Sequence, residues 1–191
     1  MTPQRRGFLG TLVAAALVLS APQATATTGE AWSALKRGGH VLILRHAQTE
    51  PGIGDPPGFR RGECSTQRNL SAQGREQARA MGRQLREAGV RWSEVLSSSW
   101  CRCLDTAALA FGSPRVFAPL DSFFDDRATE PAQTAALRER IRSFAGPDTL
   151  VLVTHQVNIT ALTGIAPAMG EAVVLAPGGA DGFAVVGRLG F

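Results

Sequence analysis

The sequence contains few of the residues on which metal chemistry depends. Only three histidines and three cysteines occur among its 191 residues. No H-E-x-x-H pattern is present, which disfavours a metallohydrolase. The three cysteines lack the ligand spacing of a zinc site, so bound zinc is disfavoured as well. The sequence therefore directs attention to chemistry that its own side chains can perform.

Long apolar runs and blocks of basic residues are also lacking. The longest apolar segment, residues 8–19, is shorter than the roughly 20 residues that a membrane-spanning helix requires. The basic residues are scattered and are not interleaved with aromatic side chains, so we expect no nucleic-acid partner. No other segment approaches the length of a membrane span.

Residues 1–26 have the pattern of a signal peptide. A charged start at Arg5-Arg6 precedes the apolar segment, and Ala24-Thr25-Ala26 is a small-residue cleavage signal. Arg5-Arg6-Gly7-Phe8-Leu9 resembles the twin-arginine export signal of bacteria. A retained membrane anchor is the alternative, which the short apolar segment disfavours. We expect a periplasmic or secreted bacterial protein with a mature domain at residues 27–191 and no stable membrane span after cleavage.

The three cysteines would then lie in an oxidising compartment, where disulfides persist. Cys101 and Cys103 are too close in sequence for an ordinary bridge between them. We therefore expect Cys64 to pair with Cys101 or with Cys103, which leaves one free thiol.

Short apolar runs alternate with helical patterns along the mature chain. Runs rich in β-branched residues are typical of strands buried on both faces of a parallel sheet. They lie at residues 41–46, 92–97, 115–120 and 150–155, with closing strands at 172–175 and 183–189. Helical patterns occupy residues 27–37, 71–89, 100–111, a segment from Pro131, and 158–163. The prediction is one α/β domain, a three-layer sandwich with a mostly parallel central sheet and helices on both faces.

Two of the predicted strands end on a histidine. Arg45 and His46 end the first of them, and His155 ends the 150–155 strand. Ligands of open α/β sheets bind beyond the carboxyl ends of the strands, so we expect both histidines to face one pocket. Arg102 lies in the turn after the 92–97 strand, where a helix begins and backbone N–H groups also favour anions. Two guanidinium and two imidazole groups predict a phosphoryl-binding pocket.

Four motifs occur in order and cover most of residues 40–165. They are Leu44-Arg45-His46-Ala47, Asn69-Leu70-Ser71-Ala72-Gln73-Gly74, Ser97-Ser98-Ser99-Trp100-Cys101-Arg102 with Thr106-Ala107, and Val153-Thr154-His155. This series resembles the histidine phosphatase superfamily, also called the phosphoglycerate mutase-like family. The resemblance implies the phosphoglycerate mutase-like fold. It also implies a phosphomonoesterase that requires neither a metal ion nor a cofactor. It assigns His46 as the nucleophile that forms a phosphohistidine, with Arg45, Arg102 and His155 completing the phosphate pocket.

The chain departs from the family pattern at three positions. Ala47 replaces the usual glycine, so the backbone there must avoid glycine-only dihedral angles. Gln156 stands where one branch of the family carries the aspartate that protonates the leaving group. Ser122 occupies the position of the glutamate that serves the other branch. These departures leave the proton donor undefined.

Asp125 is the predicted general acid. Phe123 and Phe124 precede it, and desolvation by aromatic side chains would raise the pKa of a carboxyl group. An ordinary surface carboxylate explains Asp125 nearly as well. The other candidates in this segment are Asp121, Asp126 and Glu130.

The predicted function is an exported phosphomonoester hydrolase that acts through a phosphohistidine on His46. Its substrate would be a phosphorylated small molecule or glycan, whose identity the sequence does not define. The alternative is a phosphate-ligand binding module, an inactive phosphatase on the same fold. A mutase is disfavoured because an exported enzyme would not meet a bisphosphate primer. Arg60, Arg61 and Arg68 lie in or near a long polar loop at 51–67, where they either meet the substrate or are solvated.

Overall fold

The computed structural model describes residues 27–179 and 181–191, so the expected signal peptide at 1–26 lies outside the described residues. The strands are β1 (Val41–Arg45), β2 (Trp92–Ser97), β3 (Arg115–Val116), β4 (Thr149–Thr154), β5 (Ala172–Pro177) and β6 (Phe183–Leu189). The helices are α1 (Thr28–Arg37), α2 (Ala72–Glu87), α3 (Cys101–Phe111), α4 (Glu130–Arg142) and α5 (Gln156–Thr163).

The strands form one sheet in the order β3-β2-β4-β1-β5-β6. The pairs β2–β3, β2–β4 and β1–β4 are parallel, whereas β5 pairs with β1 and β6 in antiparallel fashion. The predicted fold class, with its mostly parallel central sheet, is confirmed. Among the described residues, no helix is long and apolar enough to cross a membrane.

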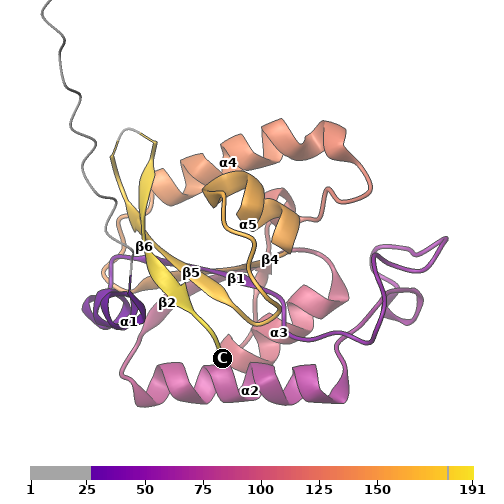
Figure 1. The fold of residues 1–191 in the computed structure, drawn as a ribbon, viewed down its shortest axis with the longest axis horizontal. Helices are drawn as coiled ribbons and strands as arrows, with labels where there is room; N and C mark the ends of the chain where they lie inside the picture. The colour runs from indigo at the N-terminus through magenta and orange to yellow at the C-terminus, as the bar shows by residue number, and fades with distance from the viewer. Residues whose placement is uncertain (1–26, 180) are drawn as a thin grey trace, which may run out of the picture.

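Helices cover both faces of this sheet (Figure 1). Along β1 the side chains alternate, because successive residues of a strand point to opposite faces. Leu42 and Leu44 pack in the core with α1, α2 and α3, while Val41 and Ile43 pack in the core with α4 and α5. Burial on both faces explains why β1 is a continuous apolar run rather than an alternating one. The strand that carries Arg45 is therefore fixed from both sides.

The third strand is shorter than the sequence predicts. Residues 115–120 read as one strand, but only Arg115–Val116 pairs with β2, and Ala118–Leu120 forms a 3-10 turn. Pro119 lies in this turn, where its fixed φ and missing N–H oppose further strand pairing. The turn still leads to the sheet edge, because Thr154 Oγ1 donates a 2.6 Å hydrogen bond to the Leu120 carbonyl. Asp121 is thereby placed beside the end of β4.

The start of α2 supports the segment that follows β1. Ser71 Oγ accepts a 3.0 Å hydrogen bond from the Gly74 N–H and so caps the helix. The Ser71 N–H in turn donates to the Gln48 carbonyl at 3.1 Å. A Cβ atom on Gly74 would lie 1.8 Å from that carbonyl oxygen, a separation that no side chain permits. Glycine at this position allows the helix to contact the backbone two residues beyond His46.

Replacing Gly74 with alanine should therefore destabilise the fold, although alanine is the better helix former. Relief of the backbone overlap should lower the free energy of unfolding by about 1–3 kcal/mol, as in other overpacked sites. Urea denaturation measures the change. Gln73→Ala, on the exposed side of the same turn, is the control and should have little effect. Wild-type stability in Gly74→Ala would contradict this role of the glycine.

Candidate active site

His46 and His155 lie together at the carboxyl edge of the sheet. β1 and β4 are neighbours with Arg45 opposite Thr154, so the two histidines follow at the same level. Their ring centroids are 5.5 Å apart. Both rings line a cavity of about 370 Å³, and Arg45 and Arg102 line it with them. The four residues predicted from the strand ends and the motifs therefore line the same cavity.

His46 is held with one ring nitrogen available to the cavity. Its Nδ1 lies 2.8 Å from the Ala47 carbonyl, so this nitrogen carries the proton and donates. Among residues 27–179 and 181–191, none forms a hydrogen bond with Nε2. Burial, reinforced by the charge of Arg102, lowers the pKa of His46 to about 3. A neutral imidazole with its Nε2 lone pair exposed to the cavity is the nucleophilic form of histidine.

Ala47 occupies the glycine position without backbone strain. None of the described non-glycine residues has a positive φ. The Ala47 N–H donates a 3.0 Å hydrogen bond to Thr106 Oγ1 of α3, and Thr106 in turn donates to the Arg102 carbonyl at 2.7 Å. The Thr106-Ala107 part of the third motif therefore connects the turn after His46 to the helix that carries Arg102.

Arg45 and Arg102 present buried N–H groups beside the histidines. Arg45 Nη1 donates to the Pro167 carbonyl at 2.8 Å, and Arg102 Nη2 lies 3.4 Å from His155 Nδ1. The Nε atoms of both arginines are buried and have no hydrogen-bond partner among the described residues. Buried donors on two cations are suited to the oxygens of an anion.

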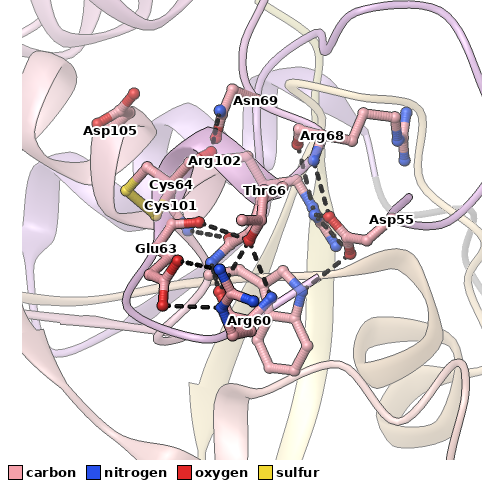
Figure 2. Close-up of a disulfide and its surroundings, with 12 residues drawn as sticks. Asp55, Arg60, Glu63, Cys64, Thr66, Arg68, Asn69, Cys101, Arg102 and Asp105 are labelled. Atoms are coloured by element: carbon pink, nitrogen blue, oxygen red, sulfur yellow. Dashed lines mark hydrogen bonds and ion pairs between the residues drawn. A yellow bond between two sulfur atoms is a disulfide. The ribbon is translucent and has the colours of Figure 1, made fainter. Parts of the chain in front are cut away.

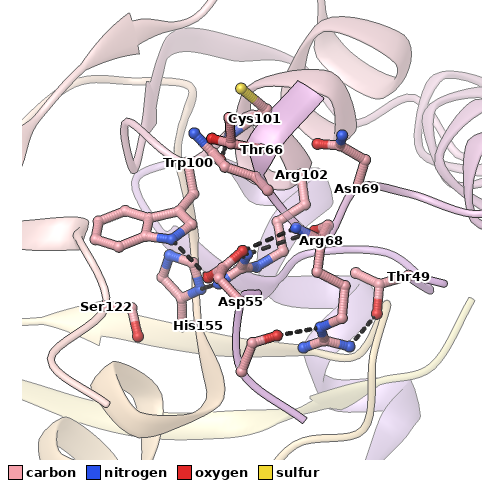
Figure 3. Close-up of polar contacts among 12 residues, drawn as sticks. Thr49, Asp55, Thr66, Arg68, Asn69, Trp100, Cys101, Arg102, Ser122 and His155 are labelled. Atoms are coloured by element: carbon pink, nitrogen blue, oxygen red, sulfur yellow. Dashed lines mark hydrogen bonds and ion pairs between the residues drawn. The ribbon is translucent and has the colours of Figure 1, made fainter. Parts of the chain in front are cut away.

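Arg68 adds a third guanidinium group to the cavity, which the sequence left undecided between a substrate contact and a solvated loop. Its Nε donates to the Gly54 carbonyl at 2.7 Å, and its Nη1 donates to Thr49 Oγ1 (Figure 3). Burial and the charge of Arg102 lower the pKa of Arg68, a sign that like charges are held close together. The cavity is therefore more cationic than the motifs alone predict.

Asp55 is a cavity residue that sequence reasoning missed. Its carboxylate forms an ion pair with Arg102 Nη1 at 2.8 Å, and both side chains are almost fully buried. Figure 3 shows the carboxylate between Arg102 and the Trp100 indole, whose Nε1 donates to it at 3.0 Å. Burial alone would raise the pKa of Asp55. Hydrogen bonds from the Arg102 side chain and from the Arg68 backbone N–H, together with the charge of Arg102, hold this pKa below its usual value. A charged Asp55 thus orients Arg102.

A disulfide joins the long loop to α3 beside these groups (Figure 2). Cys64 pairs with Cys101, the first residue of α3, and Cys103 is a buried free thiol. Of the two pairings that the sequence left open, the structure selects Cys64–Cys101. Gln67 Oε1 strengthens the junction by accepting a 2.9 Å hydrogen bond from the Cys101 N–H. The bridge holds the loop that carries Asp55 against the helix that carries Arg102.

Loss of this disulfide should loosen the loop. Cys64→Ser should lower the free energy of unfolding by about 2–4 kcal/mol, because the unfolded chain regains the conformational freedom that the bridge removes. Denaturation with and without dithiothreitol measures the effect. Reductant should destabilise the wild type but not the variant, which serves as the control. Recovery of a Cys64–Cys103 peptide under non-reducing conditions would contradict the assignment.

The predicted general acid lines the cavity but is not buried. Asp125 is exposed, Phe123 is turned into the interior, and Phe124 is about half exposed at 48%. The desolvation that favoured Asp125 in the sequence is therefore not provided by its aromatic neighbours, and only its position at the cavity supports the role. The alternatives are otherwise engaged: Asp121 with Ser98 and Ser99, Asp126 with the Ala128 N–H, and Glu130 with Arg127.

The comparisons with known proteins point to one family. The profile of the histidine phosphatase superfamily (branch 1) matches residues 41–121, from β1 to the end of the turn after β3. The predicted resemblance to the histidine phosphatase superfamily is confirmed. No curated protein sequence matches the chain. Within the described residues, no group of three or more His, Cys, Asp or Glu side chains is arranged to hold a metal ion.

Solved histidine phosphatase structures share the fold at low sequence identity. The protein histidine phosphatase SixA complexed with tungstate is 16% identical with a TM-score of 0.56, over 79% of this chain and 96% of that one. A mycobacterial glucosyl-3-phosphoglycerate phosphatase in complex with VO3 is 18% identical with a TM-score of 0.55, over 76% and 96%. The likeness extends over nearly the whole of both neighbours.

The His46 ring should remain neutral down to about pH 4, one unit above its lowered pKa. An unfolded histidine takes up a proton near pH 6.5, so the free energy of unfolding should fall as the pH decreases below that value. Ring-selective NMR during a pH titration checks the first expectation, with His46→Gln assigning the signal. A titration midpoint near 6.5 for His46 would contradict the burial argument.

Proposed function

We propose that this protein is an exported phosphomonoester hydrolase that works through a phosphohistidine on His46. The observation that carries the proposal is the state of His46 itself. Its Nδ1–H is bound to the Ala47 carbonyl, and its Nε2 lone pair faces a cavity whose lining includes Arg45, Arg68 and Arg102. A nucleophile and a cluster of cations at one point favour phosphoryl transfer over simple polar binding.

The arrangement of these groups supports the following order of events. The guanidinium groups bind the oxygens of a dianionic phosphoryl group and leave phosphorus in front of His46 Nε2. The new N–P bond forms as the bond from phosphorus to the leaving oxygen breaks, and the Ala47 carbonyl stabilises the positive charge that develops on the ring. The leaving oxygen takes a proton from Asp125 or from water. A water molecule then attacks the phosphohistidine and releases inorganic phosphate.

The structural neighbours support this activity. Two are phosphatases by their descriptions, and their structures contain tungstate or VO3, oxyanions that resemble a phosphoryl group. The substrate that we propose is a phosphorylated small molecule or glycan. In support, the cavity is lined by arginines, by residues 52–55 of the long polar loop and by Phe124.

The signal-like pattern at residues 1–26 supports export to the periplasm or the medium. The Cys64–Cys101 disulfide supports the same conclusion, since such bonds persist mainly in oxidising compartments. Cell fractionation tests it: the mature chain should be recovered outside the cytoplasm, and Arg5→Lys with Arg6→Lys should reduce export. Cytoplasmic retention of the wild type would contradict this part of the proposal.

The activity is tested with the mature chain and a panel of phosphomonoesters. p-Nitrophenyl phosphate, sugar phosphates, lipopolysaccharide-core phosphates, nucleotides and phosphopeptides cover the substrate classes. His46→Ala should lower kcat at least about a thousandfold, since it removes the nucleophile. His40→Ala is the matched control, because the His40 ring contacts the Gly38 carbonyl outside the cavity and should be dispensable.

EDTA should leave the rate unchanged. Tight binding of phosphate esters without any turnover would favour the binding module and overturn the hydrolase. Wild-type turnover by His46→Ala would reject the assigned nucleophile.

A further inference from the structure

A chain of hydrogen bonds runs from His155 away from the cavity. Ser98, directly after β2, has its Oγ 2.9 Å from His155 Nε2 and 3.1 Å from Asp121 Oδ1. The backbone N–H of Trp100 also donates to this hydroxyl, at 3.3 Å. His155, Ser98 and Asp121 are all buried. Neither Ser98 nor Asp121 takes part in the proposed phosphoryl transfer.

The donors and acceptors present determine the direction of each hydrogen bond. Cys103 Sγ also lies 3.5 Å from His155 Nε2, but its S–H donates to the Thr154 carbonyl at 3.6 Å and so supplies no hydrogen to the ring. A hydroxyl group has one hydrogen to donate and two lone pairs to accept with. An ionised carboxylate only accepts, so the Ser98 hydrogen is given to Asp121. One lone pair of Ser98 accepts from the Trp100 N–H, and the other remains for a proton on His155 Nε2. The neutral His155 ring therefore carries its hydrogen on Nε2, which leaves a lone pair on Nδ1.

In the free protein that lone pair accepts a long hydrogen bond, at 3.4 Å, from Arg102 Nη2. A phosphoryl oxygen that takes over this Arg102 N–H would leave the lone pair facing an anion, which it repels, whereas an N–H at Nδ1 would bind the oxygen. Because Nε2–H is already committed to Ser98, His155 gains a donor toward an anion by taking up a proton at Nδ1. The resulting imidazolium would donate from both nitrogens.

The surroundings oppose that proton in the free protein. Burial first, and then the positive charge of Arg102, hold the pKa of His155 well below its usual value. The charged and titratable groups near His155 are Arg102 and Cys103 of α3, Arg45 and His46 at the end of β1, Asp55 and Arg68 of the long loop, and Asp121 after the 3-10 turn. Cys103 is uncharged, because burial raises its pKa to about 12. A bound dianion and Asp121 would together supply the compensating negative charge.

We propose that a dianionic phosphoryl group binds with uptake of one proton at His155 Nδ1, and that Asp121, acting through Ser98, is the positioning residue that stabilises this imidazolium. The inference rests on the proposed function, since it concerns the same site. Asp121 makes no contact with substrate in this account. It fixes the ring's hydrogen on Nε2 and balances the charge that the second proton brings.

Sulfate is the probe that isolates this proton. It remains a dianion from about pH 5 to 8, so any proton taken up on binding belongs to the protein. Calorimetry of sulfate binding to the mature chain, in buffers of different ionisation enthalpy, counts that proton. The wild type should take up about one proton near pH 7, and its sulfate affinity should fall about tenfold for each unit of rising pH.

Two variants cut the chain at different points. Ser98→Ala removes the connecting hydroxyl, and Asp121→Asn removes the charge but keeps the shape. Loss of an opposite charge within about 6 Å lowers a pKa by about one unit or more, so both should weaken sulfate binding about tenfold near pH 7. Ser99→Ala is the matched control, because the Ser99 hydroxyl also donates to Asp121 Oδ1, at 2.9 Å, but does not reach His155.

The outcomes separate this inference from the proposed function. Sulfate binding without proton uptake by the wild type would overturn the inference. So would unchanged uptake in both Ser98→Ala and Asp121→Asn, or an equal loss in Ser99→Ala, which would indicate a purely structural effect. Ring-selective NMR of the free protein gives a second readout, in which His155 should carry its hydrogen on Nε2. Proton uptake without any phosphomonoester turnover would reject the hydrolase and leave the inference standing.

Discussion

The parallel pairing of β1 with β4 is the constraint on which the rest of the structure depends. These strands are covered by helices on both faces, and their register places His46 and His155 at the same edge. Neither strand can shift by one residue without disrupting its packing, because the shift would exchange the side chains that the two cores receive. The distance between the two imidazoles is therefore set by the hydrophobic core rather than by contacts within the cavity.

Electrostatics then determines what the paired histidines can do. Three arginines at a buried edge would repel one another, and the structure offsets part of that charge with Asp55 on Arg102. Burial first, and then the remaining positive charge, lower the pKa of His46 and keep its ring neutral, and the same charge attracts a dianion to this place. The disulfide contributes to this balance of charge, because it holds the loop that supplies Asp55 beside the helix that supplies Arg102.

The sequence predicted the parts of the site that depend on strand ends and ordered motifs. Arg45, His46 and His155 follow from the rule that ligands bind at the carboxyl ends of strands, and Arg102 follows from the turn that opens a helix. The sheet, its helices and most of their limits follow from apolar periodicity. Only β3 was overestimated, because Pro119 interrupts a run whose composition otherwise favours a strand.

The features that the sequence did not predict depend on tertiary contacts, which leave no periodic pattern in the sequence. Asp55 lies in a loop rich in glycine and proline, and only the tertiary fold brings it to Arg102. The partner of Cys64 could not be chosen, because Cys101 and Cys103 differ by two positions and only the direction of each side chain on α3 separates them. The exposure of Asp125 was equally hidden, since adjacent phenylalanines desolvate a carboxylate only when they fold over it.

The central claim is that phosphorus passes through Nε2 of His46, and trapping the intermediate tests it most directly. The protein would be mixed briefly with a labelled phosphomonoester, denatured, and digested for peptide mapping. The account predicts an acid-labile, base-stable phosphoryl group on the peptide that contains His46, which disappears as product forms. Rapid turnover with the phosphoryl group on another residue, or with no phosphoenzyme at all, would contradict it.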